Sequence, residues 1–331
     1  MTDRKTSRRR AIFLAKLGLG LGLLAWLLLW NDNWRHVLRL FADLHPVYLL
    51  PFIGLAFVLI GVSCLKWRLF LRERGLKIGL GRLFGLYLIG IFFNNFLPSN
   101  FGGDVVRAYY LGRQIASQAQ SLASVFLERL TGLVALVTLA FIACVFTPGL
   151  REGPVVMGSI LALAGGCAAL VVALWHPSLV DRLLGPLGRI RALERLVAKL
   201  HAFHDQASYF RTRPALVARA MAYSFLFHTC TVLNVYVATL VLGLELSLVR
   251  LFVVTPIILV IASLPLTPNS LGVWEWAFSV YLIPAGAALE QGLAVALLLR
   301  VQTLLASLAG GALFLAEGRA SPAPEQALPE R

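Results

Sequence analysis

Long hydrophobic runs alternate with short polar segments along almost the whole chain. A helix that crosses a bilayer needs about 20 mainly apolar residues. Six runs meet this requirement, and we predict spanning helices over residues 11–30, 47–65, 122–147, 154–175, 215–243 and 291–316. Two further apolar runs, 83–97 and 251–266, are shorter and end in segments that contain proline. The pattern predicts an all-α integral membrane protein with about six full transmembrane helices and two broken-helix pairs.

The most informative polar interruption is the segment 92–107, FFNNFLPSNFGGDVVR. It interrupts an apolar run with asparagines, a proline, paired glycines and then two charged residues. Because lipid cannot satisfy exposed backbone N–H and C=O groups, such a break is expected only against protein or a watery cavity. Transporters build substrate sites near the bilayer midplane from broken helices of this kind. The segment is therefore a candidate site.

The distribution of charge predicts the orientation of the chain. The chain is 59% hydrophobic with a mean hydropathy of +0.79, and its net charge is +14. Basic residues gather in 1–16, 66–82 and 176–219, while the segments between them are nearly balanced. This positive-inside pattern places the basic segments and both termini in the cytoplasm and argues against a nucleic-acid partner. The first run has no small-residue cleavage site, so it is interpreted as an anchor rather than a signal peptide.

The same orientation constrains the two broken segments. The chain is expected to be cytoplasmic both before residue 83 and after residue 115, so 83–97 and 104–115 form a re-entrant pair. Counting membrane crossings in the second half in the same way makes 251–266 and 271–285 a re-entrant pair that enters from the outer side of the membrane. Each half then has three spans, an odd number, which makes residues 11–147 and 154–317 an inverted repeat. A pair of thin full spans would satisfy the same count.

A matched spacing supports the repeat independently. Each half has a proline, a glycine four residues later, then an acid, and an arginine 25 residues after the acid. The first set is Pro98, Gly102, Asp104 and Arg129, and the second set is Pro268, Gly272, Glu275 and Arg300.

Arginine is the least favourable residue in these spans, because inserting one near the bilayer centre costs about 2.5–3.5 kcal/mol of free energy. Arg129 and Arg300 therefore need a partner or a cavity. Glu128, Asp104 and Glu275 are the natural partners within the chain. A lipid phosphate is the functional alternative, because guanidinium binds phosphate through two hydrogen bonds. A structural ion pair that holds the two halves in register is the other interpretation.

The polar residues at the breaks have functional and structural interpretations. The asparagines either contact a headgroup or satisfy the broken helix ends, and Gly102-Gly103 either admits a headgroup or forms a tight turn. The candidate headgroup-binding residues are Asn94, Asn95, Asn100, Gly102, Gly103, Asp104, Arg107, Glu128, Arg129, Asn269, Gly272, Glu275 and Arg300. The predicted helix breaks are Pro98, Pro265 and Pro268. His228 is interpreted as a hydrogen-bonded contact between helices.

No enzyme signature is present. The sequence lacks a Walker motif, a zincin motif, a CxxC pair and a nucleophile elbow, so we assign no catalytic residue, cofactor or metal. The segment 177–213 is predicted to be an amphipathic cytoplasmic element that lies on the anionic leaflet or serves as a packed connector. Its His201, His204 and Asp205 fit a solvated helix face better than a metal site. Residues 1–10 and 318–331 are expected to be a basic tail and a disordered tail.

Three motifs resemble the lysylphosphatidylglycerol synthase transmembrane-region family, also described as flippase-like integral membrane proteins. They are Asn95-x-x-Pro98-x-x-x-Gly102-Gly103-Asp104-x-x-Arg107, Glu128-Arg129-Leu130-Thr131-Gly132 and Pro265-x-x-Pro268-x-x-x-Gly272-x-x-Glu275. The resemblance covers about 11–317 and implies movement of modified lipids between leaflets, in pathways that include lysylphosphatidylglycerol, hopanoids and archaeal dolichol-linked lipids. The large cytoplasmic aminoacyltransferase domain of the synthases has no counterpart here, so we expect a stand-alone membrane module without lysyltransferase activity.

The leading hypothesis is a flippase in the bacterial inner membrane. It would move an anionic or modified glycophospholipid, or a polyprenyl- or hopanoid-type lipid, between leaflets. The expected partners are this lipid, the anionic inner leaflet and an enzyme of lipid biosynthesis. The alternatives are a membrane-embedded headgroup or glycosyl transferase, and a non-catalytic subunit of a lipid-biosynthesis complex.

Overall fold

The computed structural model describes residues 2–96, 102–146, 154–176, 182, 194–264 and 266–320, and this part of the chain consists of helices and the short connections between them, without a strand. The α-helices are α1 (Thr2–Leu29), α2 (Asn33–Ala42), α3 (Leu49–Glu73), α4 (Leu80–Phe96), α5 (Gly102–Gln114), α6 (Gln118–Phe146), α8 (Pro154–Trp175), α10 (Glu194–Ser208), α11 (Pro214–Val241), α12 (Leu248–Ala262), α13 (Val273–Tyr281) and α14 (Leu289–Ala320). Short 3-10 turns are η1 (Trp30–Asp32), η2 (Pro46–Tyr48), η3 (Tyr209–Thr212), η4 (Pro268–Ser270) and η5 (Ile283–Ala285).

The helices confirm an all-α membrane protein. Five stretches of the described chain are long and apolar enough to cross a bilayer: Phe13–Ala42, Pro46–Glu73, Gln118–Ala143, Pro214–Val241 and Leu289–Ala316. They correspond to five of the six predicted spans, and the remaining prediction, 154–175, forms the 22-residue helix α8. The predicted tails are placed only in part. α1 begins at Thr2 and so includes most of the basic segment, and α14 continues to Ala320, beyond which the chain lies outside the described residues.

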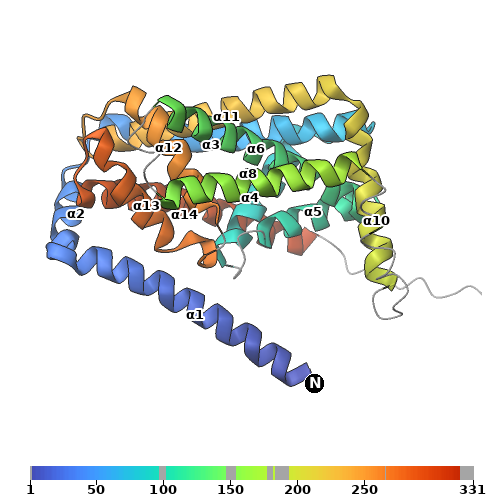
Figure 1. The fold of residues 1–331 in the computed structure, drawn as a ribbon, viewed down its shortest axis with the longest axis horizontal. Helices are drawn as coiled ribbons and strands as arrows, with labels where there is room; N and C mark the ends of the chain where they lie inside the picture. The colour runs from blue at the N-terminus through green and yellow to red at the C-terminus, as the bar shows by residue number, and fades with distance from the viewer. Residues whose placement is uncertain are drawn as a thin grey trace, which may run out of the picture.

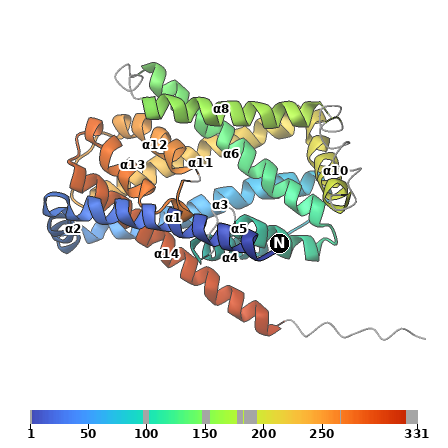
Figure 2. The same cartoon turned by 60° about the horizontal axis from the view of Figure 1, so that its bottom comes forward.

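The long helices run side by side along the longest axis of the molecule (Figure 1), with α10 across one end of the bundle and α2 at the other. The short helices form two pairs. α4 and α5 lie toward the α10 end, whereas α12 and α13 lie toward the α2 end (Figures 1 and 2). Opposite placement of the pairs agrees with the inverted arrangement, and their re-entrant insertion into a bilayer stays a prediction.

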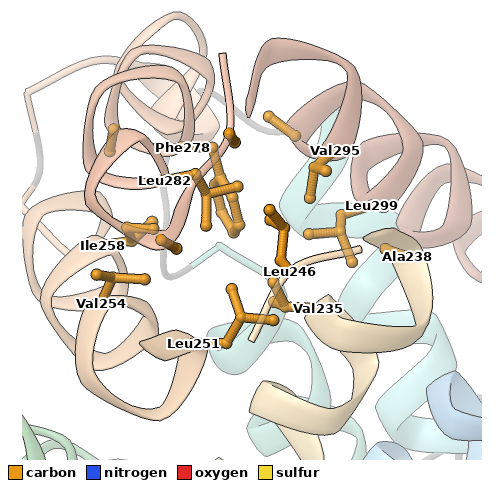
Figure 3. Packing of buried hydrophobic residues seen from close by; sticks show 14 of the residues in the cluster. Val235, Ala238, Leu246, Leu251, Val254, Ile258, Phe278, Leu282, Val295 and Leu299 are labelled. Carbon is orange, nitrogen blue, oxygen red and sulfur yellow. The ribbon is translucent and has the colours of Figure 1, made fainter. Parts of the chain in front are cut away.

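The largest hydrophobic core holds the second pair in place. Side chains from α11, α12, α13 and α14 meet there, together with Leu246 from the segment between α11 and α12 (Figure 3). The labelled members are Val235, Ala238, Leu246, Leu251, Val254, Ile258, Phe278, Leu282, Val295 and Leu299. All are buried. α1, by contrast, runs along the outside of the bundle (Figures 1 and 2).

The described part of the segment 177–213 packs on protein. Val197 of α10 is buried, and the ring of Phe203 lies 5.2 Å from that of Phe126 on α6. Lys199 and Leu200 are exposed. This packing supports the connector interpretation for α10. The positions 177–181 and 183–193 lie outside the described residues.

Glycines bring the backbones of α4 and α5 into direct contact. A Cβ atom built on Gly103 would lie 1.8 Å from the carbonyl oxygen of Gly90, far closer than two non-bonded atoms can approach. The Gly102-Gly103 pair therefore serves helix packing at Gly103, because α4 fills the space that a headgroup would need there.

This contact predicts a large difference between two glycine substitutions. We expect Gly103→Ala to lower the free energy of unfolding by about 1–3 kcal/mol or more, because α5 must move away from α4. Gly85→Ala on α4 is the matched control, since nothing lies within 4 Å of its Cβ position. It should leave stability unchanged or raise it by up to about 1 kcal/mol. Thermal unfolding of the purified variants measures both, and equal melting temperatures would contradict the packing role.

Candidate functional site

Each break is followed by a helix that carries an acid in its first turn. Asp104 is the third residue of α5 and Glu275 the third residue of α13. A carboxylate is favoured at this position, where backbone N–H groups lack partners within the helix. At the second break the Gly272 N–H donates to Glu275 Oε2 at 2.7 Å. The two acids thus occupy equivalent places at the starts of their helices.

Each of the two arginines pairs with the acid that precedes it by 25 residues. Arg129 donates from Nε to Asp104 Oδ2 at 2.9 Å and from Nη2 to Asp104 Oδ1 at 2.8 Å. Arg300 donates from Nε to Glu275 Oε1. Arg129 is the twelfth residue of α6 and Arg300 the twelfth residue of α14. The matched spacing in the sequence therefore corresponds to matched ion pairs in the structure.

Glu128 and its neighbour Arg129 pair with different residues. Its carboxylate accepts from Arg107 Nη2 at 2.6 Å and from the Tyr87 hydroxyl at 2.8 Å, and it lies 3.4 Å from Lys66 Nζ. Arg107 also reaches Asp104, with Nε 3.0 Å from Oδ1. These contacts join α3, α4, α5 and α6 in one network. We call Lys66, Asp104, Arg107, Glu128 and Arg129 the ionic cluster.

Aromatic rings and hydroxyl groups enclose the cluster. The Arg107 guanidinium carbon lies 4.8 Å from the centre of the Trp67 ring and 4.2 Å from that of Tyr87. Such stacking stabilises a desolvated cation by about 2 kcal/mol. Trp67 Nε1 donates to Ser124 Oγ at 2.9 Å, and Lys66 Nζ donates to Ser224 Oγ of α11 at 3.2 Å.

The ionic cluster carries an excess of one positive charge, since it contains three cationic and two anionic side chains. Only one of them opens outward. The Arg129 side chain is 48% exposed, whereas those of Arg107, Glu128 and Lys66 are at most 4% exposed. In the second pair Glu275 is fully buried and Arg300 is 19% exposed. Arg129 is therefore the cation of the cluster that is most accessible to a ligand approaching the surface of the protein.

Asparagines join the two breaks to each other. Asn269 Nδ2 of η4 donates to Asn95 Oδ1 at the end of α4, at 2.8 Å across 174 residues of sequence. Asn94 Oδ1 accepts from the Gly103 N–H at 2.7 Å and so satisfies the start of α5. Asn94 therefore has the structural role of satisfying a helix end, and the Asn95–Asn269 hydrogen bond brings the two breaks into contact.

The remaining predicted site residues divide into packed and undescribed positions. Gly272 has a positive φ of 79° and packs against Gly20 of α1, and Pro268 opens η4. Gly102 begins α5. Pro98, Asn100 and Pro265 lie outside the described residues. His228 contacts the Gly132 carbonyl at 3.0 Å, so its prediction as a contact between helices is confirmed.

Sequence reasoning missed Lys66, Trp67, Tyr87 and Ser224. Lys66 directly follows the apolar run 47–65 and was counted with the basic loop 66–82, although it is buried inside the bundle. One signal was present: a lysine followed at once by a tryptophan, before the run of arginines begins. Tyr87 and Ser224 carry no comparable signal.

The fold and the ionic cluster define a multi-pass helical membrane protein with a buried charged site. More particularly, residues 13–311 match the family model of the lysylphosphatidylglycerol synthase TM region, and the chain belongs to this family. A UPF0104 membrane protein from Methanothermobacter thermautotrophicus is 28% identical in an alignment of 268 positions that covers 73% of this chain and 77% of that protein. No solved structure matches the chain.

Proposed function

We propose that this protein moves an anionic or modified lipid between the leaflets of the bacterial inner membrane, as a flippase with both termini in the cytoplasm. The observation that carries the proposal is the excess positive charge of the ionic cluster, presented by a half-exposed Arg129 beside the α5 break. A guanidinium recognises phosphate through two parallel hydrogen bonds. The phosphate of a headgroup supplies the negative charge that the cluster lacks.

The contact between the breaks supports movement across the bilayer in addition to binding. The Asn95–Asn269 hydrogen bond joins the two short-helix pairs, which lie toward opposite ends of the bundle. In inverted-repeat transporters, substrate sites form where the two repeats meet, and motion of one repeat against the other changes access. The acyl tails would stay in the lipid while the headgroup passes this contact. A headgroup with a cationic substituent would also use the carboxylates.

The proposed surroundings follow from charge. Exposed basic side chains of the segments 66–82 and 176–219, such as Arg72, Lys77 and Lys199, would lie against the anionic inner leaflet, which attracts lysine and arginine by about 1 kcal/mol each. A lipid-biosynthesis enzyme is the proposed protein partner, because a modified lipid must be made before it is moved.

Substituting Arg129 tests the proposal. In phosphatidylcholine vesicles that contain a trace of nitrobenzoxadiazole-labelled phosphatidylglycerol, dithionite bleaches only the outer leaflet. The wild-type protein should expose the inner-leaflet probe, and Arg129→Gln should slow this exposure at least about tenfold, the effect of losing about 1.4 kcal/mol of interaction. The matched control is Arg213→Gln, whose arginine is 47% exposed and paired with Glu73.

Three outcomes would count against a flippase. One is an unchanged rate in Arg129→Gln, and another is an equal loss in Arg213→Gln. The third is a lipid of new mass in the vesicles, which would favour the transferase alternative.

A further inference from the structure

Asp104 occupies the position on Arg129 that an anionic ligand would take. Its two carboxylate oxygens accept from Arg129 Nε and Nη2 at 2.9 and 2.8 Å. A phosphate can bind a guanidinium through the same pair of N–H groups. Asp104 and a phosphate bound in this way would therefore compete for the same edge of Arg129.

Asp104 keeps a partner when Arg129 turns away. Arg107 Nη2 lies 2.9 Å from Asp104 Oδ1, and Arg107 itself is fixed by Glu128 and by two aromatic rings. A buried carboxylate that loses its only cation is strongly destabilised. Because Arg107 remains, Asp104 can release Arg129 without becoming an unpaired buried charge.

The corresponding pair in the second half is built differently. Glu275 is fully buried and is also held by the Gly272 N–H at 2.7 Å, and Arg300 is less exposed than Arg129. This pair fits a permanent connection between α13 and α14. The exchangeable pair is therefore in the first half.

We propose that Asp104 is an internal competitor that lowers the affinity of Arg129 for a monoanionic phosphodiester headgroup. The inference rests on the proposed function, since it takes Arg129 as the group that binds lipid phosphate. The single excess charge of the ionic cluster matches a ligand with one negative charge. A carrier must bind its substrate weakly enough to release it. Asp104 provides this weakening by returning to Arg129 as the headgroup leaves.

The test is the affinity of purified full-length protein for a water-soluble short-chain phosphatidylglycerol, measured by calorimetry. Asp104→Asn should tighten binding about tenfold, the size of a modest charge-pair coupling. Arg129→Gln should weaken binding. The double variant Asp104→Asn/Arg129→Gln should bind as weakly as Arg129→Gln, because the tightening acts through Arg129.

Glu73→Gln is the matched control, because it also removes an acid from a half-exposed arginine, Arg213. It should leave the affinity unchanged. Weaker or equal binding by Asp104→Asn, tightening that persists in the double variant, or equal tightening in Glu73→Gln would each overturn the inference. If Asp104→Asn does not fold, as judged by its melting temperature, Asp104→Ser should show the same tightening.

The binding measurement separates this inference from the proposed function. Tighter binding by Asp104→Asn together with no translocation by the wild-type protein would keep the inference and reject the flippase. Translocation without tighter binding would reject the inference alone. Absence of binding in the wild-type protein and in Asp104→Asn would reject both.

Discussion

Replacing Glu128 with glutamine should lower the free energy of unfolding by about 3–5 kcal/mol, the range observed when one partner of a buried ion pair is removed. Glu128 lies 2.6 Å from Arg107 Nη2 and 3.4 Å from Lys66 Nζ, and both cations are almost completely buried. Glutamine can still accept the hydrogen bond from Tyr87. It leaves three cations with Asp104 as the one remaining acid of the ionic cluster.

Thermal unfolding in detergent measures this loss, followed by the reaction of a thiol dye with buried cysteines. Cys64, Cys167 and Cys230 are buried and free, so they react when the bundle opens. Glu73→Gln is the control, because Glu73 forms a partly exposed pair with Arg213 that contributes about 0–1 kcal/mol.

A second variant tests the cause. Adding Lys66→Met to Glu128→Gln removes one buried cation at similar volume, so part of the stability should return. The charge-balance account would be contradicted if Glu128→Gln melted at the same temperature as Glu73→Gln, or if the double variant were less stable than Glu128→Gln.

Most of the helices and the two acid–arginine pairs were predictable from the sequence. Apolar runs of about 20 residues have few alternatives in a membrane, because every backbone group must be satisfied within the segment. The pairs were predictable because both sets share local geometry. An acid in the first turn after a break and an arginine on the next helix give the same spacing of 25 residues twice.

The inner part of the site was not predictable in the same way. Glu128 and Arg129 are neighbours in sequence, yet Arg129 pairs with Asp104 while Glu128 pairs with Arg107 and Lys66. Successive residues of a helix point in different directions. Both side chains reach α5, Arg129 at Asp104 and Glu128 at Arg107, and Glu128 also reaches Lys66 on α3. Which helix lies there depends on the packing of α3, α5 and α6. The helix α2 was missed for another reason, since its ten residues were counted as a charge-balanced loop.

Burial divides the ionic cluster into an enclosed part and the half-exposed Arg129. Glu128, Tyr87 and Trp67 fix Arg107, Arg107 fixes Asp104, and Asp104 holds Arg129 at the open side. A functional side chain is held in a precise position when packing and hydrogen bonds fix its own neighbours. A variant at Glu128 should therefore act through stability, and a variant at Arg129 through binding. This division is what the melting and vesicle measurements distinguish.

Cross-linking the two breaks should stop translocation reversibly. Asn95 and Asn269 are hydrogen-bonded at 2.8 Å and come from the two proposed repeats. A cysteine at each position, in a protein whose native cysteines are alanine, can be joined by a short bifunctional methanethiosulfonate reagent. Because the proposed transport requires the repeats to move against each other, the cross-linked protein should flip labelled phosphatidylglycerol at least about tenfold more slowly, equivalent to about 1.4 kcal/mol in the barrier.

Reduction provides the internal control, since it cleaves the cross-link and should restore the rate measured before treatment. The two single-cysteine variants, treated with the same reagent, give the effect of modification without a cross-link. If the double variant transports equally fast before and after reduction, the contact between Asn95 and Asn269 does not open during transport. The headgroup would then have to cross the bilayer by a path that leaves the two breaks together, and the ionic cluster alone would have to provide it.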